Sequence, residues 1–99
     1  MFIQTEPTPN PATLKFLPGE TVLQQGSADF PNAASAARSR LATALFEIEG
    51  VTGVFLGTDF VTVTKSEAAS WPAMKRLILG AIMEHFTARR PILLDGDAD

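Results

Sequence analysis

Apolar and polar residues follow a helical period between residues 71 and 88. When successive residues are placed about 100° apart, the apolar ones share one broad arc and Arg76 and Glu84 lie opposite. The apolar arc holds Trp71, Met74, Leu77, Ile78, Leu79, Ala81, Ile82, His85 and Phe86. Ser70 precedes the segment as a helix cap, and Pro72 is tolerated in a first turn. The pattern therefore predicts a helix over 71–88 whose apolar face lies on a sheet.

Residues 32–49 show a second helical pattern with a narrower apolar stripe. The stripe consists of Leu41, Leu45 and Ile48. Asn32 and Ser39 compete as the residue that caps this helix. Gly50 is well placed to end it, because glycine adopts the left-handed backbone conformation that closes many helices.

Four segments carry the alternation and the β-branched or aromatic residues that are typical of strands. They are residues 1–5, 13–17, 51–56 and 60–65. Gly57-Thr58-Asp59 predicts a hairpin between the last two. Residues 21–23 predict a third short strand or an extension, 26–31 a loop, and 92–94 an added edge strand. The order ββ(β)αββα predicts a two-layer α+β sandwich, with a mainly antiparallel sheet of about four strands and two helices on one face.

Composition limits both the organisation and the chemistry of the chain. Its 99 residues and 10.6 kDa suit one domain over 1–91, followed by an acidic tail at 92–99. The net charge of −3 argues against a nucleic-acid partner bound by bulk charge. The chain has no cysteine, so it holds no disulfide, thiolate zinc site or cysteine-bound iron–sulfur cluster of its own. No apolar run is long enough to span a membrane.

No pattern of residues in the sequence predicts an active site or a metal site. His85 is the sole histidine, and its place in the apolar arc predicts a partly buried side chain at the helix–sheet interface. Asp95, Asp97 and Asp99 have the spacing that opens a calcium loop, but the chain ends before the loop is complete. Trp71 is either a core anchor or an exposed contact for a partner.

The most distinctive surface candidate is the proline-containing segment at residues 7–11. Its prolines fix φ and push the residues before them to extended geometry, which predicts a stiff turn whose carbonyls lack strand partners. An ordered segment loses little conformational entropy on docking. The hairpin tip and a basic patch at the end of the second helix are weaker candidates. The predicted partner surface is Pro7, Thr8, Pro9, Asn10, Pro11, Asp59, Arg76, Arg89 and Arg90.

These residues resemble, in order and over nearly the whole chain, the N-terminal domain of Nfu-type (NifU-like) iron–sulfur cluster scaffold proteins. The most specific matches are TPNP at 8–11 with TLKF at 13–16, and GVF at 53–55 with DFVTV at 59–63. Further matches are GSADF at 26–30 and WPAMKRLILGAIMEHF at 71–86. Arg40 departs from the proline usual in the family, which changes little because a helix start does not need proline.

The resemblance implies a non-catalytic domain within a longer protein. In the family, a second domain with a Cys-x-x-Cys motif follows, and motifs from two subunits share a 4Fe–4S cluster that is handed to apo-proteins. Residues 92–99 then begin the linker to that C-terminal domain. We expect no cofactor here, and contacts with iron–sulfur apo-proteins, assembly factors and the protein's own cluster domain, but not with nucleic acid or membrane.

Three further expectations concern the oligomeric state, the compartment and an alternative function. The isolated chain is predicted to be a monomer, since the family's dimer is bridged by the cluster on the other domain. No secretory signal or Arg-rich transit peptide opens the sequence, which favours a bacterial cytoplasm; a mitochondrial matrix follows if a transit peptide has been removed. The alternative function is an independent small-ligand-binding or regulatory domain with a pocket between helix and sheet.

Overall fold

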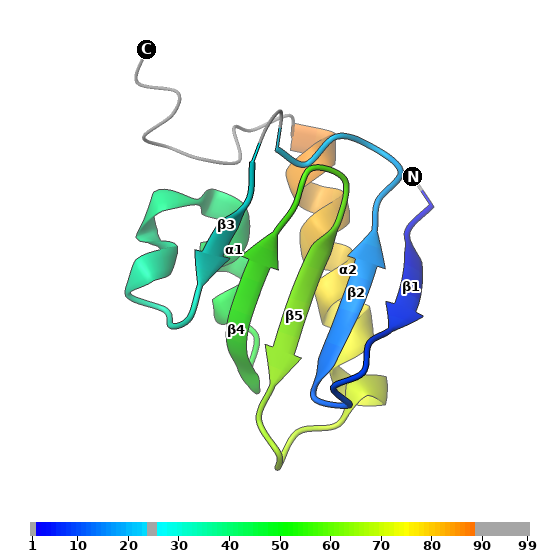
Figure 1. The fold of residues 1–99 in the computed structure, drawn as a ribbon, viewed down its shortest axis with the longest axis vertical. Coiled ribbons are helices and arrows are strands. Elements are labelled where there is room, and N and C mark those ends of the chain that lie inside the picture. The colour runs from blue at the N-terminus through cyan, green and yellow to red at the C-terminus, as the bar shows by residue number, and fades with distance from the viewer. Residues whose placement is uncertain (1, 24–25, 89–99) are drawn as a thin grey trace.

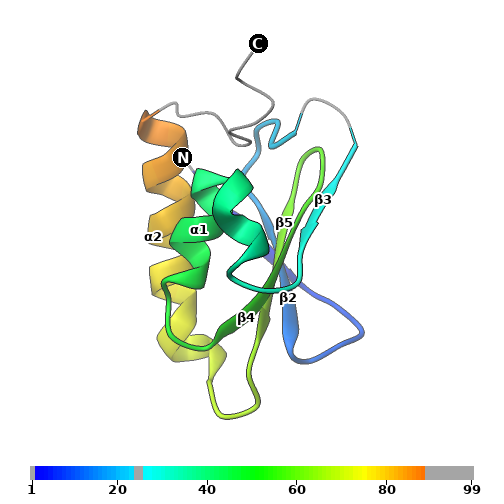
Figure 2. The ribbon, with the colours of Figure 1, turned by 90° about the vertical axis from the view of Figure 1, so that its left-hand side faces the viewer.

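The computed structural model describes residues 2–23 and 26–88 and shows one antiparallel sheet covered on one face by helices (Figures 1 and 2). The elements are β1 (Gln4–Pro7), β2 (Thr13–Leu17), β3 (Ala28–Phe30), the 3-10 helix η1 (Ser35–Arg38), α1 (Arg40–Phe46), β4 (Val51–Leu56), β5 (Val61–Lys65) and α2 (Trp71–Ala88). The sheet has five strands in the order β1-β2-β5-β4-β3. The α+β class with helices on one face is confirmed, while the sheet has five strands rather than about four.

The additional strand lies where a loop was predicted. β3 pairs antiparallel with β4, Asp29 lying opposite Phe55 at the edge of the sheet. Its buried–exposed–buried pattern spans only three residues, too short for an alternation to stand out in the sequence. Residues 21–23 form no strand; instead Val22 and Leu23 are buried, and both amides approach the Thr58 carbonyl, at 2.7 and 3.3 Å. The predicted strand at 92–94 lies outside the described residues.

The first strand is shifted relative to its prediction, from 1–5 to Gln4–Pro7. Pro7 itself lies opposite Leu14 in the register with β2. β1 is an edge strand, and a proline there costs no ladder hydrogen bond when its nitrogen faces away from the neighbouring strand. The other three predicted strands agree with β2, β4 and β5 to within one residue.

The second helix has the predicted bounds, whereas the first divides in two. Ser39 has an extended backbone (φ −137°, ψ 125°) between η1 and α1, and its hydroxyl accepts the Ala42 amide at 3.1 Å. The Asn32 side chain accepts the Ser35 amide at 3.0 Å in the turn before η1, but the cap residue of η1 is Ala34, so of the two proposed caps only Ser39 caps a helix. Gly50 has the predicted positive φ, at 101°.

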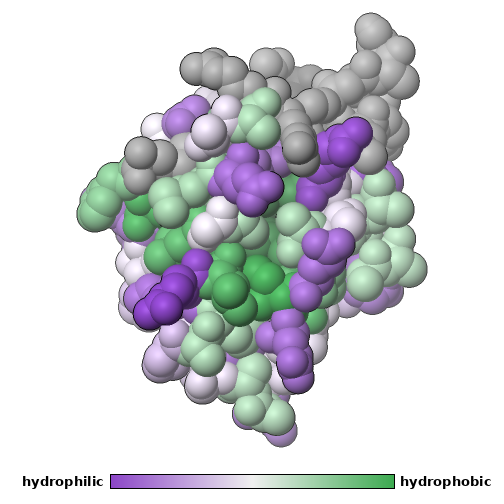
Figure 3. Space-filling model, turned by 180° about the vertical axis from the view of Figure 1, so that it is seen from behind, coloured by the Kyte–Doolittle hydropathy of each residue, from purple (hydrophilic) through white to green (hydrophobic). Residues whose placement is uncertain are grey.

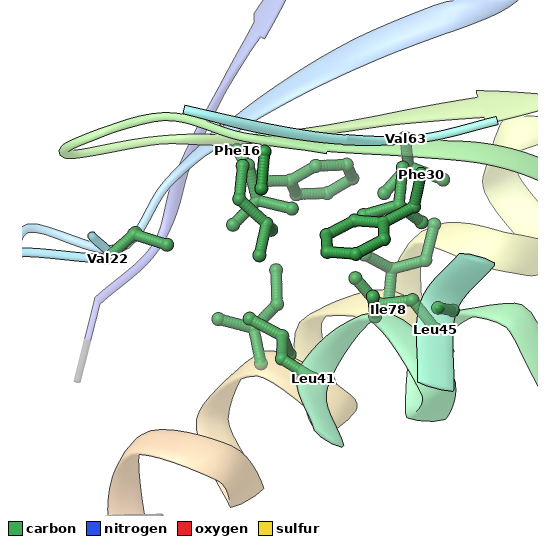
Figure 4. Close-up of a cluster of buried hydrophobic side chains, with 14 of the residues drawn as sticks. Phe16, Val22, Phe30, Leu41, Leu45, Val63 and Ile78 are labelled. Atoms are coloured by element: carbon green, nitrogen blue, oxygen red, sulfur yellow. The ribbon is translucent and has the colours of Figure 1, made fainter. Parts of the chain in front are cut away.

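The core lies between the sheet and the helices (Figure 4). Phe16 and Phe30 project from the sheet toward Leu41 and Leu45 of α1 and Ile78 of α2, and all five are at most 1% exposed. The helical arc predicted for α2 is correct at its centre and wrong at one margin. Leu77 lies at the edge of the predicted apolar arc and is 55% exposed. The sheet covers a narrower part of the helix surface than the arc spans, so Leu77 is left outside the contact.

Gly80 offers a direct test of how open the outer face of α2 is. A Cβ added at this position would meet nothing within 4 Å. Since glycine is poorer than alanine inside a helix by about 1 kcal/mol, Gly80→Ala is expected to raise the free energy of unfolding by about that amount. Urea unfolding followed by Trp71 fluorescence measures it; a destabilised variant would contradict the open environment.

Candidate functional site

The turn between β1 and β2 is held by hydrogen bonds among its own residues. The Thr8 hydroxyl lies 2.8 Å from the carbonyls of both Asn10 and Thr13. The Asn10 side-chain oxygen accepts the Ala12 amide at 2.9 Å, and the Asn10 carbonyl accepts the Thr13 amide at 2.9 Å. Together with the fixed φ of the prolines, these bonds define one conformation of the loop.

Two contacts from distant parts of the chain fix the loop to the body of the protein. The Trp71 indole Nε1–H donates to the Pro11 carbonyl at 3.0 Å. The Lys65 amide, at the end of β5, donates to the Ala12 carbonyl at 2.8 Å. The loop therefore lies beside the start of α2 at one end of the molecule (Figure 1). Trp71 is half-buried against the core, so it anchors the core and supports the loop at once.

The surface of this loop is exposed even though its backbone is engaged. Pro7, Pro9, Asn10 and Pro11 are exposed, and Thr8 is half-buried. The Asn10 and Pro11 carbonyls, which were predicted to lack strand partners, accept hydrogen bonds from the Thr13 amide within the turn and from the Trp71 indole. What the loop presents to solvent is consequently a set of proline rings and the Asn10 side chain on a fixed backbone.

The other predicted surface residues lie apart from this loop. Asp59 is in the turn between β4 and β5, at the opposite end of the sheet (Figure 1). Arg76 is exposed on α2 and lines a hollow between the two helices. Arg89 and Arg90 lie outside the described residues. The structure thus brings together Pro7 to Pro11 as one surface and adds Trp71, whose contact with Pro11 spans 60 residues of sequence.

The described residues contain no group of three or more His, Asp or Glu side chains arranged to hold a metal ion. His85 is buried, at 6% exposure, and its ring meets the Phe86 ring edge-on with centroids 5.6 Å apart. No helix within the described ranges is long and apolar enough to cross a membrane.

Fold and loop together define a small α+β domain with a preorganised, proline-containing surface. A family model described as "Scaffold protein Nfu/NifU N terminal" matches residues 3–89. The chain belongs to this family.

Relatives with curated names agree with that assignment. The chain is 51% identical over 98 residues to NifU-like protein 4, mitochondrial, of Arabidopsis thaliana, covering 99% of this chain and 35% of the relative. It is 52% identical over 96 residues to the NFU1 iron-sulfur cluster scaffold homolog, mitochondrial, of Drosophila erecta, covering 96% and 34%. The chain thus spans about a third of the length of these relatives.

Solved structures show the same fold. The solution structure of a NifU-like protein from Saccharomyces cerevisiae superposes with a TM-score of 0.80 at 26% identity, over 93% of this chain and 83% of that one. A crystal structure of a Staphylococcus aureus protein gives a TM-score of 0.71 at 23% identity, over 83% and 99%. At that identity the second likeness concerns the fold alone.

Proposed function

We propose that this chain is the non-catalytic N-terminal domain of an iron–sulfur cluster scaffold or carrier, and that it supplies protein contacts for delivering clusters. Family membership and the scaffold names of the relatives support a role in cluster assembly. The absence of cysteine from the sequence is consistent with cluster ligands that lie outside this chain. In this proposal the cluster is cargo, held by cysteines that lie outside this chain.

The observation that carries the proposed role in protein contacts is the hydrogen bond from Trp71 Nε1 to the Pro11 carbonyl, at 3.0 Å. It fixes the exposed residues Pro7 to Pro11 to the start of α2, so that little conformational entropy is lost when a partner binds them. The partners are the iron–sulfur apo-proteins, assembly factors and the protein's own cluster domain.

The names of the relatives bear on the compartment in which the protein works. The plant and fly relatives are mitochondrial by name, which supports the mitochondrial-matrix alternative. They give no support to the bacterial cytoplasm that the sequence favoured. We therefore propose the matrix as the working compartment.

An NMR titration tests the contact role. Labelled chain is mixed with the Cys-x-x-Cys domain, with and without its cluster, and then with an apo-client. Because prolines lack an amide proton, the reporters are the amides of Thr8, Asn10 and Ala12 and the Trp71 indole. Localised shifts there are expected. A spectrum unchanged at high partner concentration would contradict the proposal, and a thermal shift with a small metabolite alone would favour the ligand-binding alternative.

Trp71→Phe tests the anchor itself. The substitution retains an aromatic ring and removes the indole N–H, so the loop loses its tie to α2. We expect stability to fall by about 1 kcal/mol and partner affinity to fall about five- to tenfold. Calorimetry of binding and urea unfolding measure the two effects. Thr87→Ala, exposed at the far end of the same helix, is the control and should leave affinity unchanged. Equal affinities for Trp71→Phe and the unmodified chain would contradict the anchor's role.

A further inference from the structure

A hollow of about 450 Å³ lies between α1 and α2, on the side of the molecule away from the sheet. Its floor is small and apolar, made of Ala44, Gly80 and Ala81, and Leu77 stands exposed at its margin. Seen from the helix side, the surface has an apolar centre ringed by hydrophilic side chains (Figure 3). Such a contiguous apolar area on a helical face marks an interaction surface when polar groups rim it.

Four charged side chains line the hollow. Arg40 and Glu47 come from α1, and Arg76 and Glu84 from α2. Within residues 2–23 and 26–88, none of the four makes an ion pair, in contrast to Lys15 and Glu6 on the sheet. Two positive and two negative side chains therefore surround the apolar floor without forming ion pairs with one another.

The two helices run in opposite directions, which sets where these charges lie. α1 ends near the start of α2, since a Cβ added at Gly50 would lie 2.8 Å from that of Ala69 (Figure 2). Arg40 and Glu84 consequently share one end of the hollow, and Glu47 and Arg76 share the other.

We propose that this face binds a second copy of the chain, in a two-fold arrangement that crosses the α2 helices antiparallel at Gly80. A two-fold interface must be self-complementary, and this face is. Arg76 and Glu84 each lie four residues from Gly80, so an antiparallel crossing sets Arg76 of each copy against Glu84 of the other.

The remaining groups fit the same arrangement. Each end of the interface receives Arg40 and Glu84 from one copy and Glu47 and Arg76 from the other, so both ends are electrically balanced. Leu77 and Met83 are 55% and 39% exposed, and each lies three residues from Gly80. In the antiparallel crossing, Leu77 of each copy therefore comes level with Met83 of the other and shields it from solvent. Gly80 allows close approach, because nothing lies within 4 Å above it. A helix-pair contact of this size gives a weak, concentration-dependent dimer, unlike the monomer the sequence predicts.

Charge reversal tests the proposal without disturbing the core. Sedimentation equilibrium on the unmodified chain up to about 1 mM should show a monomer–dimer equilibrium. Arg76→Glu alone places an excess of negative charge at both ends, and Glu84→Arg alone an excess of positive charge. Each variant alone is expected to weaken self-association about tenfold or more.

Mixing the two variants gives the decisive result. In a mixed pair, one end of the interface retains the original charges. At the other end, Glu47 and the glutamate at position 76 of one copy face Arg40 and the arginine at position 84 of the other copy. Association should therefore be restored. Lys75→Glu and Glu67→Arg make the same charge changes at residues that do not line the hollow, and should leave association unchanged. A chain that stays monomeric throughout, a dimer indifferent to both reversals, or a mixture that fails to associate would each overturn the proposal.

Discussion

Phe30→Ala is expected to lower the free energy of unfolding by about 3–5 kcal/mol, the cost of deleting a fully buried aromatic side chain. Phe30 is 1% exposed and packs from the edge strand β3 onto the helical layer (Figure 4). β3 is held by β4 alone, so its place in the sheet depends strongly on this one side chain. Urea unfolding followed by Trp71 fluorescence measures the loss.

Asp29→Ala supplies the matched control. Asp29 is the exposed middle residue of the same three-residue strand, so its truncation should change stability by no more than about 0.5 kcal/mol. If Phe30→Ala cost no more than Asp29→Ala, residues 26–31 would behave as the loop that the sequence pattern indicated, and the fifth strand would not be part of the folded core.

The elements that sequence patterns predicted well are the long ones. α2 spans 18 residues, enough for several turns of apolar periodicity, and its predicted and observed bounds agree. The β4–β5 hairpin is similarly marked, because Val61 and Val63 alternate with threonines in β5, directly after a glycine-containing turn. β3 was not predicted, because three residues are too few to show a period. Its burial also depends on pairing with β4, about 25 residues later in the chain.

The candidate site also has features that local sequence predicts and features that depend on tertiary packing. Prolines at 7, 9 and 11 act on their own backbone, so the stiffness and exposure of the loop were predictable from local chemistry. The Trp71–Pro11 hydrogen bond was not, because it joins residues 60 apart that only the packing of α2 on the sheet brings together. The hollow between α1 and α2 is likewise a product of packing: Leu77 counted as a core residue in the helical arc and turned out to be exposed at the margin of that hollow.

Gly50 closes α1 at a crowded turn, against the loop that leads into α2. Its φ of 101° lies in a region that residues with a Cβ adopt at a cost of about 1–3 kcal/mol. A Cβ built there would also lie 2.8 Å from the Ala69 Cβ and 3.2 Å from the Met74 sulfur. The Met74 side chain can move, but the Ala69 Cβ is fixed to its backbone, so relief requires the loop before α2 to shift.

Gly50→Ala is therefore expected to destabilise the protein by about 2–5 kcal/mol, combining backbone strain with overpacking. Gly80→Ala is the matched control, since the same methyl group placed on the open face of α2 should stabilise by about 1 kcal/mol. Thermal and urea unfolding of the two variants side by side measure effects of opposite sign. Because Gly50 sets how the end of α1 meets the start of α2, its substitution should also perturb the amide shifts of Ala69 and Met74 in the variant that remains folded. A Gly50→Ala protein as stable as the unmodified chain would show that neither the left-handed backbone nor the contact with Ala69 is required at this turn.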